Sequence, residues 1–478
     1  MSLIPVEDIR RTLSDQKLQT AIYASTGRLI DKRRSTVAAD GLPDYQELRA
    51  QANRIKRHTL DNLDFYLEQL ERSLEAHGGK VIWCDTGEDV ADFILGLAKD
   101  RGARLIVKSK SMTTEEIHLN QRLEHHRLEA VETDLGEYIV QLADERPYHI
   151  VAPALHKTRF DVARLFTEKL GVPREEVIEK QTMIARSVLR EKFLAADIGV
   201  TGANFLIADS GAVVVVENEG NARLTSSAPK IHIAVAGIEK VIPRAQDLGV
   251  FLKLLGRSAT GQPLTVYTSF LSGPRRSPES DGPGEFYLVL LDNGRTKLLA
   301  DAAKRESLFC IRCGACLNSC PVYRKIGGHN YPWVYSGPIG AVITPQYHGI
   351  LHDPWLPYAS SLCGACGEVC PVKIDIPRLL LELRSEVVAE KTAQGGNGAE
   401  RTAFRMFAWV ARHPGLYARF AALAAILAPH GHDGWLRSIP PPRPRALRNW
   451  LSQRDLPAPA KQSFRQWWRA RSRIRQSS

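Results

Sequence analysis

The chain of 478 residues has no long hydrophobic run of the kind that crosses a membrane. The nearest candidate, residues 403–428, is interrupted by three arginines, a histidine and a proline, so it falls short of the roughly 18 apolar residues that a spanning helix needs. The first 34 residues also lack the apolar core of a secretory signal peptide. We therefore predict a cytoplasmic protein, and leave open a peripheral position on the inner face of the membrane.

Acidic residues are nearly absent from the C-terminal segment. Residues 401–478 contain 15 Lys and Arg but 2 Asp and Glu, whereas the whole chain contains 64 and 53. The rest of the chain, with 49 basic and 51 acidic residues, is almost neutral. This basic tail favours contact with an anionic membrane or an acidic partner subunit, and not with nucleic acid, because no nucleic-acid-binding motif accompanies it. Its residues of interest are Trp467, Trp468, Arg469, Arg471, Arg473 and Arg475.

Cysteine is also scarce, except in one short stretch. Of the 8 cysteines, 7 lie between Cys310 and Cys370, a span of 61 residues. A disulfide-stabilised secreted domain would spread its cysteines along the chain, so this clustering indicates metal ligation in a reducing compartment. The remaining cysteine, Cys84, ends the apolar run Val81–Trp83 and is expected to be a buried core thiol.

Hydrophobic patterns divide the chain into four expected segments. Residues 1–77 are expected to be helical, because leucines recur at steps of three and four from Leu60 to Leu74. In residues 78–295, β-type runs alternate with helical patterns, which predicts an α/β domain with a mostly parallel sheet. We expect strands near residues 81–84, 104–108, 128–132 and 148–152, and a second half of the same sheet between Phe205 and Asp292. Residues 296–390 form the cysteine segment, and residues 400–478 a helical, basic tail.

The first cysteine motif has the spacing of an iron–sulfur ligand set. It reads Cys310-x2-Cys313-x2-Cys316-x3-Cys320-Pro321. Three cysteines two residues apart ligate three irons of one cluster, and in two-cluster ferredoxins the fourth cysteine, which precedes a proline, ligates the other cluster. A zinc site usually has two separated pairs of ligands instead. The motif therefore predicts a helical, ferredoxin-type domain with two clusters, both of the [4Fe-4S] kind unless the second is incomplete.

The second motif, Cys363-x2-Cys366-x3-Cys370-Pro371, is one cysteine short, and Ser360 stands at the missing position. With crossed ligation, four thiols hold the first cluster: Cys310, Cys313, Cys316 and Cys370. Three thiols remain for the second cluster: Cys320, Cys363 and Cys366. Three alternatives remain for the fourth corner of this cluster. The cluster has only three irons, a partner subunit supplies the fourth ligand, or the fourth iron is ligated by Ser360, His348, His352 or water.

Several further stretches resemble one known family. They are Val107–Met112, Glu132–Glu137, Gly199–Asn204, Gly337–Gly340 and Phe464–Trp468. In this order, and together with the cysteine motifs, they resemble lactate utilisation protein B, the iron–sulfur subunit of a bacterial three-protein system that oxidises lactate. The resemblance covers nearly the whole chain, and the second motif of that family also has three cysteines.

This resemblance implies an N-terminal lactate-utilisation (LUD) domain, similar in fold to the sugar-phosphate isomerase and CoA-transferase superfamily. It implies an electron carrier in the oxidation of L-lactate to pyruvate rather than a stand-alone catalyst, and it assigns no catalytic residue to this chain. Its implied partners are a second iron–sulfur subunit and a small LUD-domain subunit, with a respiratory acceptor beyond them. The alternative is a ligand-binding or transferase-type enzyme whose clusters act as a sensor or scaffold.

The α/β segment contains weaker candidates for a ligand site. Glu217 follows a β-type run and resembles the glutamate loop of CoA transferases, although a polar turn explains it as well. Lys108 and Lys110 suit an anionic ligand, or lie at a solvated strand end. Residues 201–204 form either a substrate loop or the end of a helix. Three histidines in or beside apolar runs are expected to belong to the core: His149, His156 and His232.

Overall fold

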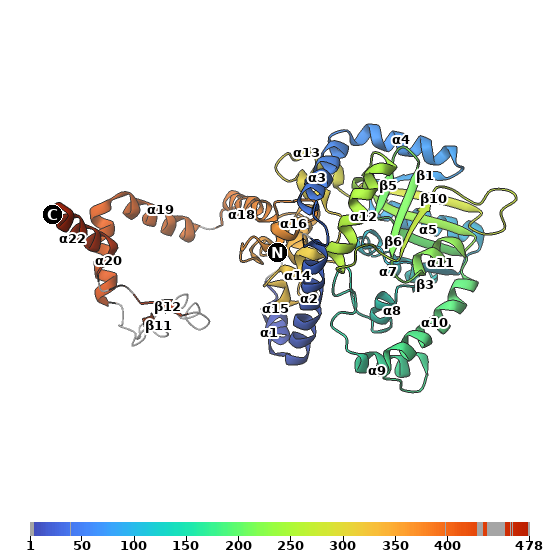
Figure 1. Cartoon of the computed structure of the whole chain (residues 1–478), viewed down its shortest axis with the longest axis horizontal. Coiled ribbons are helices and arrows are strands. Elements are labelled where there is room, and N and C mark those ends of the chain that lie inside the picture. The colour runs from blue at the N-terminus through green and yellow to red at the C-terminus, as the bar shows by residue number, and fades with distance from the viewer. Residues whose placement is uncertain are drawn as a thin grey trace. The chain divides into compact units, whose positions relative to one another are not determined.

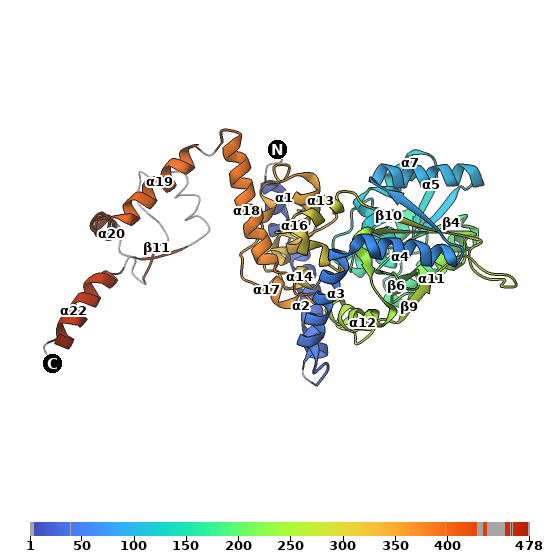
Figure 2. The same ribbon diagram turned by 90° about the horizontal axis from the view of Figure 1, so that it is seen from above.

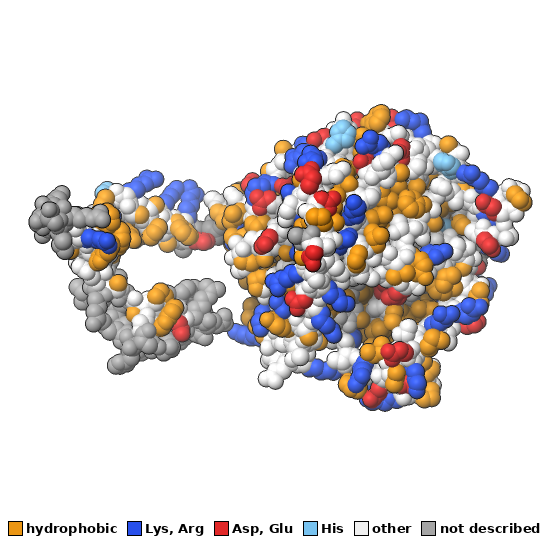
Figure 3. All heavy atoms as spheres, in the orientation of Figure 1, with side chains coloured by type: hydrophobic (Ala, Val, Ile, Leu, Met, Phe, Trp, Pro, Cys, Tyr) orange, Lys and Arg blue, Asp and Glu red, His pale blue; other side chains and the backbone are white. Residues whose placement is uncertain are grey.

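The computed structural model describes residues 4–38, 40–396, 398–427, 434–436, 455–458, 460 and 462–476. The chain divides into two compact units, Met1–Ala389 and Glu390–Ser478. In the space-filling view, Lys and Arg side chains on the visible face of the first unit alternate with Asp and Glu (Figure 3). This mixture agrees with the nearly neutral composition of the chain outside its basic tail.

Four helices open the first unit: α1 Val6–Ser14, α2 Gln16–Val37, α3 Tyr45–Asp61 and α4 Leu63–Ala76 (Figure 1). The leucine stripe is buried, as its spacing predicts, from Leu60 at 3% exposed to Leu74 at 0%. Two helices share the stripe, because the backbone leaves the helical conformation at Asn62. α4 packs on the first strand of the sheet that follows.

A six-stranded, parallel sheet forms the centre of the unit, in the order β1-β10-β7-β4-β2-β3 (Figures 1 and 2). Its strands are β1 Lys80–Cys84, β2 Leu105–Lys108, β3 Glu129–Glu132, β4 Ile198–Gly202, β7 Ile231–Gly237 and β10 Glu285–Leu291. Parallel sheets are covered by helices on both faces, which explains why their strands are apolar runs. The helices between these strands are α5 Gly87–Arg101, α6 Met112–Glu116, α7 Leu119–His125, α8 Leu135–Leu142, α9 Arg159–Leu170 and α10 Ile178–Ala195.

A second, four-stranded sheet has the order β8-β5-β6-β9. Its strands are β5 Phe205–Ile207, β6 Ala212–Glu217, β8 Val241–Ile242 and β9 Tyr267–Leu271. The expectation that all strands after Phe205 extend the first sheet is therefore wrong. β5 and β6 form an antiparallel hairpin, in which Gly211 with a φ of 68° turns the chain back beside itself. α11 Asn221–Ser227 packs mainly on β4 of the first sheet, the short helix η1 Ile238–Lys240 precedes β8, and α12 Ala245–Ala259 packs on α3 and β5.

The expected strand at residues 148–152 is also wrong, since residues 148–151 form bends and a turn follows at residues 153–156. The ring nitrogen Nδ1 of His149 accepts hydrogen bonds from the N–H groups of Val151 and Ala152, at 3.0 and 3.2 Å. These are amide groups that a strand would need for its ladder. The sheet contains β4 instead. Its last two residues, Thr201 and Gly202, belong to the strand and not to the expected loop or helix end.

Short helices build the cysteine segment: α13 Arg295–Ala300, η2 Arg305–Phe309, α14 Ala315–Ser319, α15 Tyr323–Ile326, α16 Gly337–His348, η3 Leu356–Tyr358, α17 Ala365–Val369 and α18 Ile376–Ala393. α2 packs against α14 and α15, and α3 packs against η2. One continuous hydrophobic core joins this segment to the second sheet and to α3 and α4. The cysteines are therefore held by the same core as the α/β domain.

The second unit contains α19 Gly398–Arg412, α20 Pro414–Leu427, α22 Phe464–Gln476 and the paired short strands β11 Trp435–Leu436 and β12 Leu456–Pro457. Within α22, Trp467 and Trp468 are exposed, whereas the side chains of Arg473 and Arg475 lie outside the described residues. In the part of the chain that the structure describes, no helix combines the length and apolar character needed to cross a membrane.

Candidate metal centre and the adjoining cavity

The first motif forms a tight loop that leads into a short helix. Cys310 follows η2, Cys316 lies in α14, and Cys320 comes directly after α14. The loop can close because Arg312 and Gly314 both adopt positive φ values, 59° and 74°. A side chain at position 314 would also crowd His149, whose ring would lie 3.1 Å from the new Cβ. The small residue between the cysteines is thus required by both backbone conformation and space.

The second motif repeats this arrangement. Gly364, with a φ of 85°, precedes α17 as Gly314 precedes α14, and Cys366 lies in α17. Cys370 comes directly after that helix, in the position that Cys320 has after α14. α14 and α17 pack against each other. The two motifs are therefore structural counterparts that lie side by side.

The thiols fall into two groups. A small space of about 20 Å³ is lined by three thiols of the first motif and one of the second: Cys310, Cys313, Cys316 and Cys370. The thiols of Cys320, Cys363 and Cys366 lie close enough together for the charge of one to affect the others. In crossed ligation, the first group would hold one cluster and the second group the other.

The surroundings of the thiols fit an iron–sulfur group. Burial raises the pKa of Cys370 to about 11 and that of Cys366 to about 12, because the thiolate form loses hydration. Backbone N–H groups partly offset this loss, as at Cys370, whose Sγ accepts from the N–H of Ile374 at 3.3 Å. All eight cysteines are free. Buried, unpaired thiols with amide donors are the ligand environment of iron, whose charge would hold them in the thiolate form.

The residues considered for the open position of the second group differ in their surroundings. His348 packs on Trp333 with 4.3 Å between ring centroids, and Nδ1 of His352 lies 2.8 Å from an oxygen of Asp353. The two histidines and Asp353 form a group of their own. Ser360 remains beside the second motif, where its hydroxyl accepts the N–H of Leu362 at 3.1 Å.

A buried charge network joins the α/β domain to the first cysteine loop. Arg295, whose side chain is 1% exposed, donates to both oxygens of Glu116 at 2.9 Å and to Glu239 at 2.6 Å. Tyr335 donates to Glu116 at 2.7 Å, and Arg312 lies 3.7 Å from Glu239. Burial alone would raise the pKa of Glu239, but Arg295 and the other cations outweigh it and hold this pKa at about 2. The network therefore keeps its charges and fixes the position of the loop.

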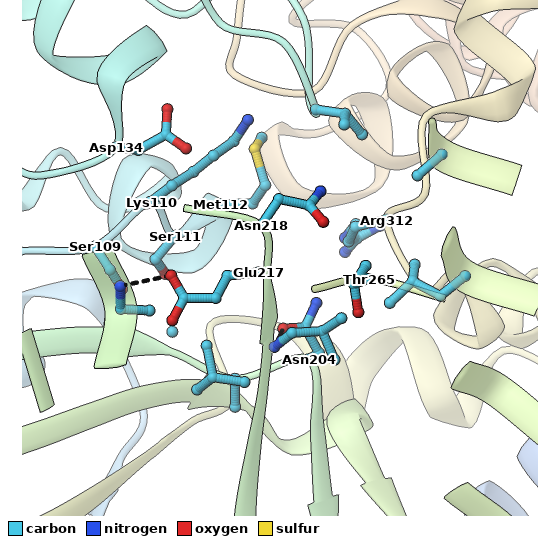
Figure 4. A pocket seen from close by; sticks show the side chains of 18 of the residues that line it. Ser109, Lys110, Ser111, Met112, Asp134, Asn204, Glu217, Asn218, Thr265 and Arg312 are labelled. Atoms are coloured by element: carbon cyan, nitrogen blue, oxygen red, sulfur yellow. Dashed lines mark hydrogen bonds between the residues drawn. The ribbon is translucent and has the colours of Figure 1, made fainter. Parts of the chain in front are cut away.

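A cavity of about 280 Å³ adjoins the same loop (Figure 4). Its wall includes residues after the carboxyl ends of β2, β4 and β6, together with Arg312 and Cys313. In Figure 4, Lys110 and Arg312 enter from opposite sides, with Glu217 and Asn204 between them. Ligands of open α/β sheets bind at this edge, outside the carboxyl ends of the strands.

Three family models match the chain. The LUD domain matches residues 67–291, a 4Fe-4S dicluster domain matches residues 306–374, and the C-terminal region of lactate utilisation protein B matches residues 382–473. Lactate utilization protein B of Bacillus pumilus is 46% identical over 474 residues, which cover 98% of each chain. That of Bacillus velezensis is 44% identical over 98% of this chain and 97% of its own. The chain belongs to the lactate utilization protein B family.

Two other similarities accompany this family assignment. A relative from Escherichia coli K12, named uncharacterized electron transport protein YkgF, is 43% identical over 96% of this chain and 95% of its own. A solved structure of a DUF162 family protein from Deinococcus radiodurans covers 48% of this chain and 98% of its own at 12% identity. Its TM-score of 0.25 is too low to support an argument. The family assignment rests on the sequence relatives.

Two of the weaker candidates in the LUD match have structural roles. Lys108 is 1% exposed and lies 2.6 Å from Glu132 and 2.9 Å from Glu115, so it is not at a solvated strand end. Glu217 accepts the N–H groups of Ala222 and Arg223, both at 2.8 Å, at the start of α11. This contact supports the interpretation of Glu217 as part of a polar turn. Lys110, in contrast, lines the cavity.

All three histidines have largely buried side chains, as expected of core residues. His149 and His232 are each 1% exposed, and burial lowers the pKa of each to about 3, so both are neutral. His149 contacts Asn318 at 3.1 Å, across the boundary between the α/β domain and the cysteine segment. The side chain of His156 is 9% exposed, stacks on Tyr148 with 4.6 Å between ring centroids and lies 2.6 Å from Glu145.

The buried charge network around Arg295 was not predicted from the sequence. Its members share no motif spacing, and Glu116, Glu239 and Arg295 are far apart along the chain. One signal was present: Glu239 and Lys240 interrupt an otherwise apolar run from Ile231 to Ile242. Charged residues inside such a run are buried only when they are paired, so this interruption indicates a buried ion pair.

Proposed function

We propose that the chain is the iron–sulfur electron-transfer subunit of a multi-protein system that oxidises L-lactate to pyruvate. The proposal combines the family assignment with the cysteine arrangement, and the E. coli relative that is named an electron transport protein supports it. The observation that carries it is the small space lined by three thiols of one motif and one of the other. Such exchange of a ligand between motifs is typical of paired clusters that relay electrons.

In this proposal, two [4Fe-4S] clusters accept and pass on single electrons. The first would be held by Cys310, Cys313, Cys316 and Cys370. The second would be held by Cys320, Cys363 and Cys366, with a [3Fe-4S] form or a non-cysteine ligand left open for its last position. The protein's own contribution is to bury five of the seven thiols and to direct backbone N–H groups at the sulfurs of Cys310, Cys320 and Cys370.

The remaining parts of the proposal concern organisation. We assign residues 1–77 to a helical segment, 78–295 to the LUD domain, 296–390 to the ferredoxin-type domain and 400–478 to the basic tail. The LUD domain would share the fold of the sugar-phosphate isomerase and CoA-transferase superfamily. Its partners would be a second iron–sulfur subunit and a small LUD-domain subunit in the cytoplasm.

A transferase reaction through Glu217 is a weaker alternative, because the carboxylate of Glu217 already accepts hydrogen bonds from two backbone amides.

The test is iron analysis and EPR on anaerobically purified protein. We expect about seven or eight irons per chain, a brown absorbance that bleaches when L-lactate and the companion proteins are added, and EPR signals from both clusters in the reduced protein. Cys316→Ser should remove the signal of the first cluster. Cys84→Ala, which alters a buried thiol far from both motifs in sequence, should leave the iron content unchanged. A colourless protein, or full reduction by lactate of the Cys316→Ser protein, would refute the proposal.

A further inference from the structure

The cavity beside the first cysteine loop is not used by the electron-transfer proposal. It holds about 280 Å³, room for a small metabolite. Its lining comes from the α/β domain and from the cysteine segment within one compact unit. A molecule bound there would touch Cys313, one of the four thiols of the first group.

Lys110 gives this cavity an ammonium group that lacks a hydrogen-bond acceptor among the described residues. In the described part of the chain, no hydrogen-bond acceptor lies within reach of its buried ammonium nitrogen. The carboxylate that comes nearest in an ion pair is Glu137, at 3.9 Å. Burial raises the pKa of Glu137 well above its ordinary value despite the nearby Lys110. A buried ammonium without a full partner is costly, and an anionic ligand would relieve that cost.

Arg312 provides a second unused donor on the opposite side. Its side chain is 8% exposed, lies 3.7 Å from Glu239 and stacks over the ring of Tyr335 at 4.4 Å. These contacts hold the guanidinium in place, yet its Nη1 has no hydrogen-bond partner among the described residues. A fixed guanidinium with a free N–H edge is suited to bind a carboxylate.

The acidic residues of the cavity restrict the charge of the ligand. Asp134, Glu217 and Glu219 also line the cavity. Their carboxylates would repel a dianion such as phosphate more strongly than a monoanion. The wall is mixed in character, because Val215, Leu255 and Met112 contribute apolar surface. Apolar surface with a few polar anchors is typical of pockets for organic molecules rather than for inorganic ions.

We propose that this cavity binds a small organic monocarboxylate, with its carboxylate between Lys110 and Arg312 and its other end beside Cys313. The site itself is argued from the fold and these side chains, whereas the choice of pyruvate and L-lactate as its ligands rests on the proposed function. This proposal assigns the α/β domain a ligand site of its own, next to the thiols.

The experiment uses full-length, anaerobically purified protein of verified iron content. Calorimetric titration with sodium pyruvate should give a Kd in the range of about 1 μM to 1 mM, as is usual for metabolite sites. L-lactate should compete for the same site, and inorganic phosphate should bind more weakly than pyruvate. Pyruvate should also change the EPR line shape of the first cluster, which is a signature of a ligand close to Cys313.

Matched lysine variants locate the site. Lys110→Met should weaken pyruvate binding about tenfold or more, because a charge-assisted hydrogen bond is lost. Lys157→Met is the control, since its side chain is 20% exposed against 18% for Lys110 and it pairs with Glu145 outside the cavity. Its affinity should change by less than about twofold.

A second variant, Ala203→Leu, fills part of the cavity without changing charge and should also weaken binding. It keeps the test valid if Lys110→Met loses iron. The proposal is overturned if the wild-type protein binds no carboxylate, if phosphate binds more tightly than pyruvate, or if folded Lys110→Met and Ala203→Leu proteins bind as the wild type does. None of these results would affect the iron content or the bleaching by lactate and companions, which test electron transfer separately.

Discussion

Arg295→Met should destabilise the first unit substantially. The substitution keeps most of the side-chain volume but leaves the carboxylates of Glu116 and Glu239 buried, at 0% and 2% exposed, without their shared cation. Breaking a buried ion pair by removing one partner costs about 3–5 kcal/mol. Unfolding entropy of about 2.1 cal/mol/K per residue gives about 0.8 kcal/mol/K for residues 1–389. The expected fall in Tm is therefore about 4–6 °C.

The assay is differential scanning calorimetry of the anaerobic, iron-loaded protein. The scan rate is fixed, because large multidomain proteins commonly unfold irreversibly and their apparent Tm then depends on it. In the wild type, the lowered pKa of Glu239, about 2, contributes stability that is present above its unfolded pKa of roughly 4.3 and is lost as the pH falls toward 2. This contribution is constant between pH 6 and 8. In the variant, burial without Arg295 raises the pKa of Glu239, so the loss of Tm should be larger at pH 8 than at pH 6.

Arg244→Met is the matched control. Arg244 also pairs with a carboxylate, that of Asp247 at 3.2 Å, but its side chain is 65% exposed. Exposed pairs contribute about 0–1 kcal/mol, so Tm should fall by no more than about 1 °C. If Arg295→Met lowered Tm no more than Arg244→Met does, with equal iron content, the network would not be the stabilising junction inferred here.

Two further predictions concern the cysteine segment and the tail. In Gly328→Ala, the added Cβ would collide with the carbonyl group of Tyr148, so overpacking of about 1–3 kcal/mol should lower Tm by about 1–4 °C. Gly96→Ala, in a helix with open space around it, should instead raise Tm by about 1 °C, and a fall of equal size in both would contradict the packing argument. A 1–440 truncation, which removes Trp467 and Trp468, should float less with anionic liposomes than the intact chain, since each basic residue at such a surface contributes about 1 kcal/mol. Equal flotation of both forms would exclude a membrane role of the tail.

The sequence could predict elements whose cause is local. Apolar runs bounded by turns predicted β1, β2 and β3 to within about two residues, and the leucine stripe predicted which face of α3 and α4 is buried. The start of the expected helical tail is present as α19 and α20, divided at His413, which precedes Pro414. Proline starts a helix readily and does not continue one, so this division has a local cause as well.

Elements that depend on distant partners could not be predicted in the same way. β5 and β6 have the same apolar pattern as the strands of the large sheet, and their membership in a second sheet depends on which neighbours they meet. Residues 148–152 have a β-type pattern too, but the ring of His149 takes up two of their amide groups. Pattern indicates which face is buried, whereas pairing is decided by the chain as a whole.

The same division applies to the site. The spacing of the cysteines is a property of the chain itself, because a cluster ligand set requires thiols two residues apart within one loop, so the sequence alone determined the iron–sulfur chemistry and the family. Only the tertiary structure decided that Lys110 and Arg312, 202 positions apart, border one cavity. It also decided that Arg295 joins two carboxylates from separate segments. Such contacts follow from packing between distant segments, which leaves no periodic signal along the chain.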